Sequence, residues 1–507
     1  MAQILDARER DQSRLNSVHS HDVLIVGGGP TGLMLAGELA LAGVDVALVE
    51  RRVDQGVPGT RALGLYPRTM EVFDMRGIGD RFVEAGTQYP SLNFHVPLEV
   101  SDFPTKRNYL LGLIQNHTEE ILASWVDGLP VTFYRGRSAI ALEQGDKTVL
   151  TTFDSGEQVD AAYVVGCDGG KSFVRKALGI GFPGWPASTS WIMAEAQTTV
   201  EPKWGFHLDS SGNQHAIAKT EESDIARMVL VEPEAYHEAE PAFEDVKLAL
   251  FAAYGTDFGA HDPRWVSRFT DMARQAETYR KGRVLLAGDA AHVHAPLGGQ
   301  GLGIGIQDAV NLGWKLAQVV KGMSPDTLLD TYEQERHPVA ARVIQNTMAL
   351  SALRRPDPHS KALAGYFAEL LEMEEPRKFM AAELSGLGTT YDLGDRHLLL
   401  GRRIPDLGIV VDGQPTSIYV LLREARPVLI SFDGAGLPDV GPWLSRVTLV
   451  SALASEPLVL PLVGKVRMPG AVLVRPDGYI AWTDQDVPND LHAALRMWLG
   501  DPAGRPT

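Results

Sequence analysis

The chain has 507 residues, a length typical of two or three domains, and its 44% hydrophobic and 22% charged residues are ordinary for a folded soluble protein. Its 47 basic and 64 acidic residues give a net charge of −17. This balance excludes nucleic acids and anionic membranes as expected partners, because both require a basic face. The single cysteine, Cys167, excludes an intrachain disulfide and a cysteine metal cluster.

The N-terminal stretch is charged and polar and lacks the apolar core of a signal peptide. We therefore predict a disordered extension over residues 1–20 and a cytoplasmic protein. Leu24–Val49 is the most apolar region, but Glu38, Asp45 and several glycines interrupt it. A buried strand–helix–strand unit explains this region better than a membrane span, so no membrane contact is expected.

The stretch from residue 22 to 50, DVLIVGGGPTGLMLAGELALAGVDVALVE, predicts a strand, a glycine-rich turn, a helix and a second strand. Gly27, Gly29 and Gly32 have the spacing that allows a tight turn, close approach to a pyrophosphate and close helix–strand packing. Glu50 ends the second strand, where an acid suits a ribose hydroxyl. The stretch predicts a dinucleotide site without identifying the dinucleotide.

Two further stretches place a carboxylate after a strand. YVVGCDGGKSFVRKALG, from residue 163 to 179, predicts a strand that ends at Asp168 ahead of a helix. In residues 282–322, a short apolar strand is followed by Asp289, a glycine-rich turn and a long helix. A carboxylate, glycines and a helix N-terminus are the parts needed to hold an anionic ring or a phosphate.

These three stretches in this order resemble the aromatic (group A) flavoprotein monooxygenases, the class of p-hydroxybenzoate hydroxylase. The resemblance runs from about Asp22 to the C-terminus and is most specific at Gly166–Gly170 and Arg283–Ala317. Within this family the chain looks closest to the aromatic-polyketide hydroxylases of the angucycline type and to rifampicin monooxygenase.

The resemblance implies an α/β fold in three units: a Rossmann-like FAD-binding domain of the glutathione-reductase type, an inserted antiparallel-sheet domain for the substrate, and a thioredoxin-like C-terminal domain. Alternating polar and apolar residues from Trp191 to Val231 fit the inserted sheet. The C-terminal unit has no cysteine, so it cannot carry out dithiol chemistry. The expected ranges are 21–176 with 277–395, 177–276, and 396–507.

The resemblance also implies which residues bind FAD, partly because Gln115 fits a Gln-x-x-Thr-Glu helix start. The cofactor-binding residues it implies are Gly27, Gly29, Gly32, Glu50, Arg51, Arg61, Gln115, Asp168, Asp289, Gly301, Leu302 and Gly303. Pro296 matches the proline whose carbonyl lies beside the reacting oxygen. Many relatives have Asn where Gly303 stands. His292 and His294 flank this loop and are expected to be structural, and no metal site is expected.

The function implied is hydroxylation of a polycyclic aromatic polyketide by an FAD- and NADPH-dependent monooxygenase, through a flavin C4a-hydroperoxide, as a tailoring step in antibiotic biosynthesis. The expected partners are a bulky aromatic small molecule and O₂. The sequence does not decide whether the protein forms a homodimer. Baeyer–Villiger oxygenation, or oxidative inactivation of an aromatic antibiotic such as a rifamycin, remains the close alternative. No catalytic base is identified; His207 and Arg227 are weak candidates because they lie in the predicted substrate sheet.

A different class of protein is a flavin-binding protein without turnover, or an NAD-dependent dehydrogenase that uses Gly27–Gly32. The dehydrogenase leaves both aspartate motifs unexplained. Further along, Asp326–Leu353 predicts a long helix with Pro338 inside, kinked there. Its Glu333, Glu335, Arg336 and His337 are expected to form a solvated face.

Overall fold

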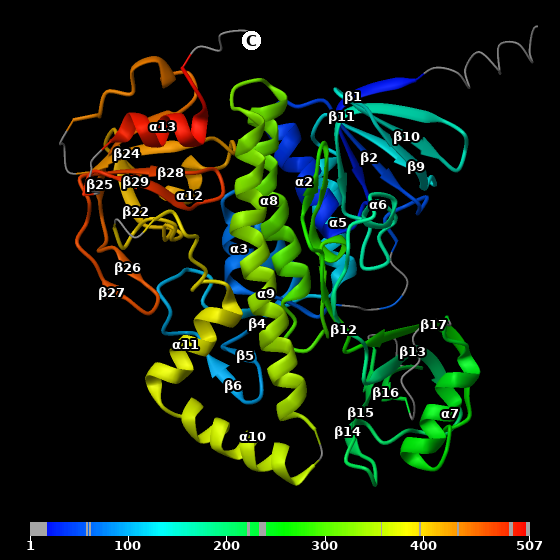
Figure 1. Ribbon diagram of the computed structural model, residues 1–507. Helices are drawn as coiled ribbons and strands as arrows, with labels where there is room; N and C mark the ends of the chain where they lie inside the picture. Colours follow the sequence, from blue (N-terminus) through cyan, green and yellow to red (C-terminus); the bar gives the residue numbers. More distant parts are fainter. Residues whose placement is uncertain are drawn as a thin grey trace, which may run out of the picture.

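The computed structural model describes residues 18–56, 59, 62–220, 224–232, 240–355, 357–394, 397–432, 436–485 and 490–502. Two long helices, α8 (Gly301–Val320) and α9 (Asp330–Leu353), run side by side through the centre of the molecule (Figure 1). Three larger sheets surround them, with eight, five and six strands. Of the predicted disordered extension, residues 1–20, the first 17 lie outside the described part, whereas His19 and Ser20 begin the first strand.

The eight-stranded sheet contains five parallel strands in the order β20-β11-β1-β2-β8. Parallel strands are covered on both faces, which explains their nearly continuous apolar runs. Helix α2 (Pro30–Leu41) packs so closely on α8 that a Cβ at Gly313 would lie 2.6 Å from Glu38 Cβ. The strands of this sheet are β1 (His19–Val26), β2 (Val46–Glu50), β8 (Val131–Arg135), β9 (Ala139–Gln144), β10 (Val149–Phe153), β11 (Gln158–Gly166), β19 (Arg280–Lys281) and β20 (Val284–Leu286).

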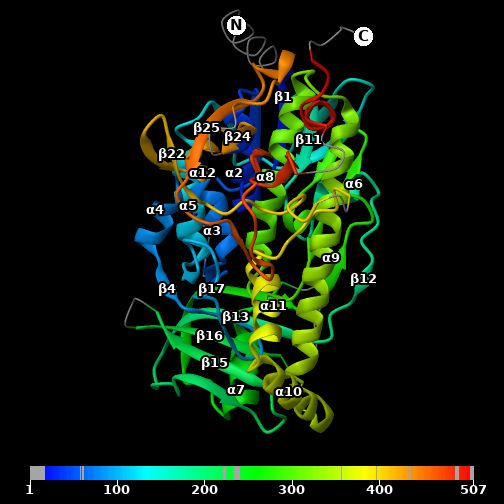
Figure 2. The same cartoon turned by 90° about the vertical axis from the view of Figure 1, so that its left-hand side faces the viewer.

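The five-stranded sheet is antiparallel and lies at the opposite end of the molecule from β1 and β24, as Figure 2 shows. One of its faces packs on helix α7 (Phe243–Tyr254) through Ile192, Ala194 and Leu250. The other face is only half-buried, which accounts for the alternating sequence pattern. Its strands, in sheet order, are β14 (Gly205–Leu208), β15 (Gln214–Lys219), β16 (Ile225–Val231), β13 (Ser190–Thr198) and β17 (Ala260–Thr270).

The six-stranded sheet belongs to the C-terminal unit and has the order β23-β22-β25-β24-β28-β29. β24 and β25 are parallel, and the other neighbours are antiparallel. Helix α13 (Leu491–Leu499) packs on it through Leu495 and Trp498. The strands are β22 (Gly408–Val411), β23 (Gln414–Ser417), β24 (Val428–Phe432), β25 (Thr448–Ala454), β28 (Ala471–Val474) and β29 (Ile480–Thr483).

Shorter elements join these sheets. The helices are α3 (Pro67–Asp74), α4 (Gly79–Ala85), α5 (Gln115–Val126), α6 (Phe173–Ala177), α10 (Pro358–Leu371), α11 (Glu374–Ser385), α12 (Ile418–Leu421), and the 3-10 turns η1 (Gly288–Ala290), η2 (Asp326–Leu329) and η3 (Gly441–Trp443). The strands are β3 (Gly64–Leu65), β4 (Thr87–Tyr89), β5 (Ser91–Asn93), β6 (Pro97–Glu99), β7 (Leu110–Gly112), β12 (Gly184–Trp185), β18 (Ala273–Gln275), β21 (His292–Val293), β26 (Val459–Leu460) and β27 (Gly464–Lys465).

The turn between β28 and β29 inserts against the segment around α3. The Pro476 carbonyl accepts a hydrogen bond from Arg76 Nη2 (2.9 Å), and the Asp477 carbonyl accepts one from Arg68 Nη2 (2.7 Å). A Cβ at Gly478, where φ is +78°, would lie 2.6 Å from Met75 Sδ. The C-terminal unit is therefore docked on α3 by polar groups that are removed from water.

Behind this turn lies a group of buried polar side chains that we call the interdomain cluster: Asn311, Lys315, Glu335, Arg475 and Asp477. Arg475 Nη1 donates to Glu335 Oε1 (2.6 Å) and its Nη2 donates to Asp477 Oδ2 (2.5 Å). Lys315 Nζ lies 2.9 Å from Glu335 Oε2, and Asn311 Nδ2 bonds both carboxylates. The cluster joins α8, α9 and the C-terminal unit.

The expectation that α9 presents a solvated face at Glu335 and Arg336 is wrong. Both side chains are buried, because their partners come from α8 and from the C-terminal unit. Arg336 Nε donates to Asp308 Oδ1 (2.7 Å) and its Nη1 reaches the Tyr391 hydroxyl (3.2 Å). Helix α9 runs from Asp330 to Leu353 without a break at Pro338.

Low pH is expected to lower the free energy of unfolding, because Glu335 becomes protonated. Burial favours the neutral carboxyl, but Arg475 and Lys315 outweigh it and lower the pKa of Glu335 from 4.5 to about 2. Stabilisation from the ionised form is thus complete above pH 4.5 and is lost as the pH falls towards 2, on the order of 3 kcal/mol in all. We expect the free energy of unfolding, from urea titrations between pH 3 and 6, to depend less on pH in Glu335→Gln. The exposed control Glu372→Gln should keep the original pH dependence; equal slopes in all three proteins would contradict the assignment.

Candidate active site

The loop between β1 and α2 contains the three predicted glycines. At Gly27, where φ is +110°, a Cβ would lie 2.4 Å from the Cys167 carbonyl oxygen, and at Gly32 a Cβ would lie 1.9 Å from the Gly27 oxygen. Around Gly29, by contrast, none of the described residues beyond its chain neighbours has an atom within 4 Å of the Cβ position. The lack of side chains at Gly27 and Gly32 therefore allows β1, β11 and α2 to pack closely. Gly29 instead leaves open space at the N-terminus of α2, where backbone N–H groups favour an anion.

Glu50 ends β2 beside this loop. Its Oε2 accepts a hydrogen bond from the Gly28 amide (2.6 Å), and its Oε1 accepts from the Arg52 amide (2.9 Å) and from Arg52 Nε (3.0 Å). Burial alone would raise the pKa of Glu50, but the hydrogen bonds from Arg52 and Gly28 prevail and lower it. The carboxylate is ionised at neutral pH and lies where a ribose hydroxyl can donate to it.

The start of α5 is tied to the same loop by the buried carboxylate of Glu119. Arg52 Nη1 donates to Glu119 Oε2 (3.0 Å), and Gln55 Nε2 donates to the same oxygen (2.8 Å). Gln115 Nε2 donates to Glu119 Oε1 (2.7 Å). Arg52 and Gln55 also reach the Gly28 carbonyl (3.1 and 2.9 Å). The structure thereby places Gln115 in one network with the glycine-rich loop.

Two arginines of this region, Arg51 and Arg61, are predicted to bind the cofactor. The Arg51 side chain is exposed, whereas the neighbouring Arg52, which sequence reasoning missed, bridges Glu50 and Glu119. Adjacent residues after a strand point in different directions, so only the contacts distinguish them. Arg61 lies outside the described residues.

Asp168 follows β11. Its Oδ2 accepts a hydrogen bond from the Val174 amide (3.0 Å), and its buried Oδ1 has no hydrogen-bond partner in the described part of the chain. Arg175, also missed from the sequence, donates to the carbonyls of Gly170 and Ala290 (both 2.8 Å). Arg175 thereby joins the Asp–Gly turn to the turn that carries the third predicted carboxylate.

That third carboxylate is Asp289, in η1 at the end of β20. Its side chain is exposed, and no described residue donates a hydrogen bond to it. The turn is held from behind by buried Asp308, whose Oδ2 accepts from the Gly288 amide (3.1 Å) and from His292 Nε2 (2.7 Å). Burial opposes ionisation of Asp308, but Arg336 and His292 outweigh it and lower its pKa. His292 is therefore structural, and Asp289 is the carboxylate free to meet a ligand.

We call residues 294–300 the glycine loop; it leads into α8. The Pro296 ring is exposed and its carbonyl accepts a hydrogen bond from the Gly299 amide (3.2 Å). Tyr66 donates its hydroxyl to the Gly298 carbonyl. His294 Nδ1 lies 2.8 Å from the Ala295 carbonyl, which makes Nδ1 the donor and leaves the buried Nε2 without a partner among the described residues.

Helix α8 begins at Gly301, so the amides of Gly301, Leu302 and Gly303 precede its first intrahelical hydrogen bond, which Ile304 donates. These N–H groups and the positive end of the helix dipole favour negative charge. A Cβ at Gly301 would lie 3.5 Å from His294 Nε2, and one at Gly303 would lie 2.6 Å from Thr69 Oγ1. A developing anion on a bound ring would be stabilised here.

The half-buried face of the five-stranded sheet carries Trp191, Glu195 and Arg227, with Arg227 Nη2 3.1 Å from Glu195 Oε1. Trp265, opposite Glu195 in the sheet, lies against the loop after β2, because a Cβ at Gly59 would be 2.1 Å from its ring. His207 instead stacks on Tyr254 of α7 at 4.5 Å between ring centroids. Of the two base candidates, therefore, only Arg227 lies on this face.

The arrangement fits a dinucleotide. Glu50, Asp168 and Asp289 all follow parallel strands of one sheet, and the carboxyl ends of parallel strands share an edge. The open space at Gly29 and the unpartnered oxygen of Asp168 match a pyrophosphate and a hydroxyl donor. Within the described residues, no group of three or more His, Cys, Asp or Glu side chains could hold a metal ion. No helix in that part is long and apolar enough to cross a membrane.

Comparison with known proteins agrees with this arrangement. A family described as FAD binding domain matches residues 20–347, and one described as aromatic-ring hydroxylase, C-terminal, matches residues 397–502. OxyS anhydrotetracycline hydroxylase from Streptomyces rimosus is 41% identical, with a TM-score of 0.88 over 96% of this chain and 100% of that chain. Rifampicin monooxygenase from Streptomyces venezuelae is 41% identical over 94% of this chain and 98% of its own.

A third similar protein is described differently. The structure of the Diels-Alderase PyrE3, from the biosynthetic pathway of pyrroindomycins, is 35% identical and has a TM-score of 0.80 over 95% of this chain and 100% of that chain. The predicted resemblance to rifampicin monooxygenase and to angucycline-type hydroxylases is confirmed, as is the mixed α/β fold. The chain belongs to the family of FAD-dependent aromatic-ring hydroxylases.

Proposed function

We propose that this protein is an FAD-dependent monooxygenase that takes electrons from NADPH and hydroxylates a polycyclic aromatic polyketide. The observation that carries the proposal is the position of three carboxylates, Glu50, Asp168 and Asp289, at one sheet edge next to the free N–H groups of α8. The names of the relatives that act on anhydrotetracycline and rifampicin support the substrate class.

Different residues of the site would hold different parts of FAD. Gly29 and the N-terminus of α2 receive the pyrophosphate, and Glu50 receives the adenosine ribose. Asp168 and Asp289 accept hydrogen bonds from hydroxyl groups of the ribityl side. The amides at the start of α8 would stabilise negative charge on the reduced ring.

When bound and reduced, the flavin supplies activation of O₂ and transfer of one oxygen atom. The protein must then orient the aromatic ring and keep water out. The half-buried sheet face with Trp191, Trp265 and Phe269 forms an apolar wall for the substrate, and the Trp191 and Phe269 rings stack at 5.2 Å. The Arg227–Glu195 pair gives that wall one polar position for a phenol or ketone oxygen. Pro296, exposed in the glycine loop, would lie beside the reacting oxygen.

The proposed division into domains follows the sheets. The inserted range 177–276 contains the five-stranded sheet, and the range 396–507 contains the six-stranded one. The order β25-β24-β28-β29, with only the first pair parallel, supports a thioredoxin-like C-terminal unit.

Two outcomes compete with hydroxylation. Baeyer–Villiger insertion also incorporates one oxygen atom, and it is distinguished by the product. A flavin-binding protein without oxygen transfer is favoured by one observation, the 35% identical structure described as a Diels-Alderase. Such a protein would convert a substrate without consuming NADPH.

The proposal is tested by incubating the purified protein with NADPH and ¹⁸O₂, using anhydrotetracycline and rifampicin as probes. We expect one ¹⁸O atom in the product. We also expect stopped-flow measurements to show faster flavin reduction with the probe than without it, because gated reduction limits wasted peroxide. Reactions with ¹⁶O₂ in H₂¹⁸O, and with NADH in place of NADPH, are the controls. Label found only in water or H₂O₂, or a product formed without NADPH, would contradict the proposal.

A further inference from the structure

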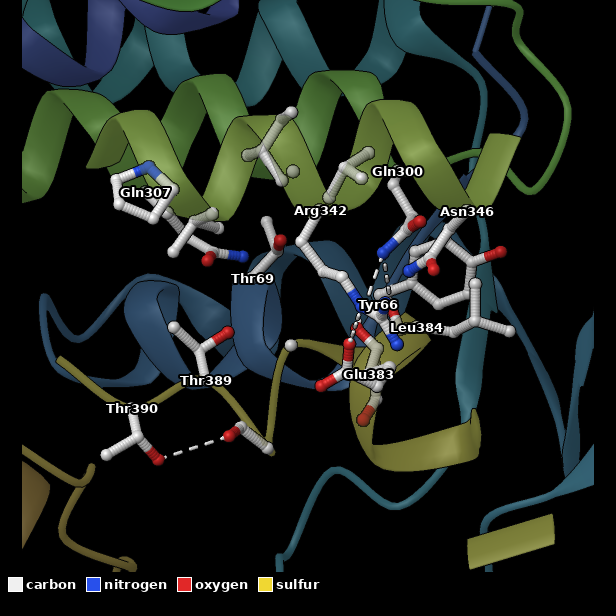
Figure 3. A pocket seen from close by; sticks show the side chains of 18 residues that line it. Tyr66, Thr69, Gln300, Gln307, Arg342, Asn346, Glu383, Leu384, Thr389 and Thr390 are labelled. Atoms are coloured by element: carbon white, nitrogen blue, oxygen red, sulfur yellow. Dashed lines mark hydrogen bonds and ion pairs between the residues drawn. The ribbon is translucent and has the colours of Figure 1, made fainter. Parts of the chain in front are cut away.

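A cavity of about 300 Å³ lies between α3, α8, α9 and the end of α11. Figure 3 shows Tyr66 just before α3, Thr69 of α3, Gln300 before α8, and Arg342 and Asn346 of α9 around it. Apolar side chains, among them Val343, complete the wall. A volume of this size is at the lower end of those found for small-molecule sites.

This cavity lies on another face of α8 than the proposed FAD site, although Gly303 borders both. Gly305 faces α2, since a Cβ there would lie 2.4 Å from Thr31 Oγ1, and Asp308 faces the Gly288 amide. Gln300, Gly303 and Gln307 line the cavity instead. At 100° per residue, these positions lie roughly a third of a turn away from Gly305 and Asp308.

Three buried polar atoms of the cavity wall have no hydrogen-bond partner among the described residues: Thr69 Oγ1, Gln300 Oε1 and Asn346 Nδ2. The side chains that bear them are 0%, 4% and 7% exposed. Buried polar groups are nearly always hydrogen-bonded, so three unpartnered ones around one cavity indicate that a polar molecule belongs there.

The wall also indicates what that molecule is. Gln300 Nε2 donates to the carbonyls of Leu384 (3.1 Å) and Glu383 (3.4 Å), so Gln300 Oε1 is the amide atom left to accept a hydrogen bond. The charges of Arg342 and Glu383 at the wall neutralise each other, with Nε 2.7 Å from Oε2. A site with no spare charge selects a neutral ligand, because burying an unpaired ion is unfavourable.

We propose that this cavity binds a neutral aromatic carboxamide. Its NH₂ group would donate to Gln300 Oε1, its carbonyl would accept from Asn346 Nδ2 and Thr69, and its ring would lie on Val343 and Ile304. Gly303 keeps the site open, because a side chain there would meet the Thr69 hydroxyl.

Occupancy of this cavity reaches the glycine loop. Gln300 is the last residue of that loop, and Tyr66, which holds the Gly298 carbonyl, lines the cavity too. A ligand that takes hydrogen bonds from this wall therefore shifts the residues next to the flavin. Only this second effect rests on the proposed function, since binding itself requires no catalysis.

The test titrates benzamide into the full-length, FAD-loaded protein. Binding is followed by saturation-transfer NMR on benzamide and, separately, by the visible spectrum of the flavin. We expect saturable binding with a flavin difference spectrum. Benzoate, the charged analogue of the same shape, should bind at least about tenfold more weakly. The Asn346→Leu protein should bind benzamide about tenfold more weakly, because one buried hydrogen bond is lost.

Two variants complete the test. Val343→Phe fills the cavity and should abolish binding, while Gln345→Leu, exposed on the same helix, should bind like the unchanged protein. Folding and FAD content are checked by thermal melting and absorbance; if Val343→Phe does not fold, the pair Asn346→Leu and Gln345→Leu decides. Absence of benzamide binding to the unchanged protein, or binding with the same Kd in Val343→Phe and Asn346→Leu, would overturn the proposal. NMR binding without a flavin change would leave the site standing and remove only its link to the glycine loop.

Discussion

An Asp289→Ala protein is expected to bind FAD about 10- to 100-fold more weakly than the unchanged protein while keeping its fold. The carboxylate is exposed and has no donor in the described part of the chain, so its removal breaks no internal contact. The loss falls on the cofactor, which forfeits a charge-assisted hydrogen bond of about 1.5–3 kcal/mol. The Kd is measured from the quenching of FAD fluorescence by the apoprotein.

Two matched variants separate binding from folding. Asp127→Ala, at an exposed position beyond α5, should change neither the Kd nor the melting temperature. Asp308→Asn should lower both FAD affinity and stability, because Asp308 holds Gly288, His292 and Arg336 in the interior. An Asp289→Ala protein that retains FAD with an unchanged Kd would mean that Asp289 does not touch the cofactor.

Replacement of Arg475 by leucine is expected to destabilise the protein by about 3–5 kcal/mol, because it leaves buried Glu335 and Asp477 without their main cation. Removing one partner of a buried ion pair destabilises a protein much more than replacing both partners with apolar residues. The guanidinium also lies 4.6 Å from the centre of the Trp498 ring, so packing is lost as well. The free energy of unfolding from urea titration measures the effect.

The control is Arg496→Leu. Arg496 pairs with Asp501 at 3.1 Å on the surface, and such pairs contribute at most about 1 kcal/mol. The double variant Arg475→Leu with Glu335→Leu should recover part of the lost stability, because the unpaired carboxylate is removed. Equal effects of Arg475→Leu and Arg496→Leu would show that the interdomain cluster does not hold the C-terminal unit in place.

The parts of the site that sequence predicted are those set by local spacing. Gly27, Gly29 and Gly32, and the carboxylates after β2, β11 and β20, could be placed because glycine spacing and apolar strands are read within a few tens of residues. Arg52 could not be told from Arg51, since they are adjacent and only the folded network separates them. Arg175 gave no signal either, because its carbonyl partners are defined only by the fold.

The larger error concerned α9. Glu335 and Arg336 look like surface residues when the helix is read alone, yet their partners are remote in the chain, Arg475 lying 140 positions from Glu335. The sequence does carry one signal, the Pro476-Asp477-Gly478 turn directly after Arg475. An arginine at the end of a fully buried strand, followed by such a turn, requires buried acceptors elsewhere. Local patterns find the binding loops, but charge pairing between distant segments depends on the tertiary structure.

The insertion of the turn between β28 and β29 has a consequence for synthesis of the protein. Chains are made from the N-terminus and tend to fold domain by domain as they emerge. Here Arg68, Arg76 and Glu335 are synthesised before residues 475–477. These later residues supply some of their hydrogen-bond partners and are made close to the end of the chain. The FAD-binding part therefore cannot reach its final form on the ribosome. Ribosomes that stop before residue 475 would release a nearly complete enzyme in which Arg68 and Arg76 lack two buried carbonyl acceptors and Glu335 lacks Arg475, and such chains are expected to be recognised by cellular quality control.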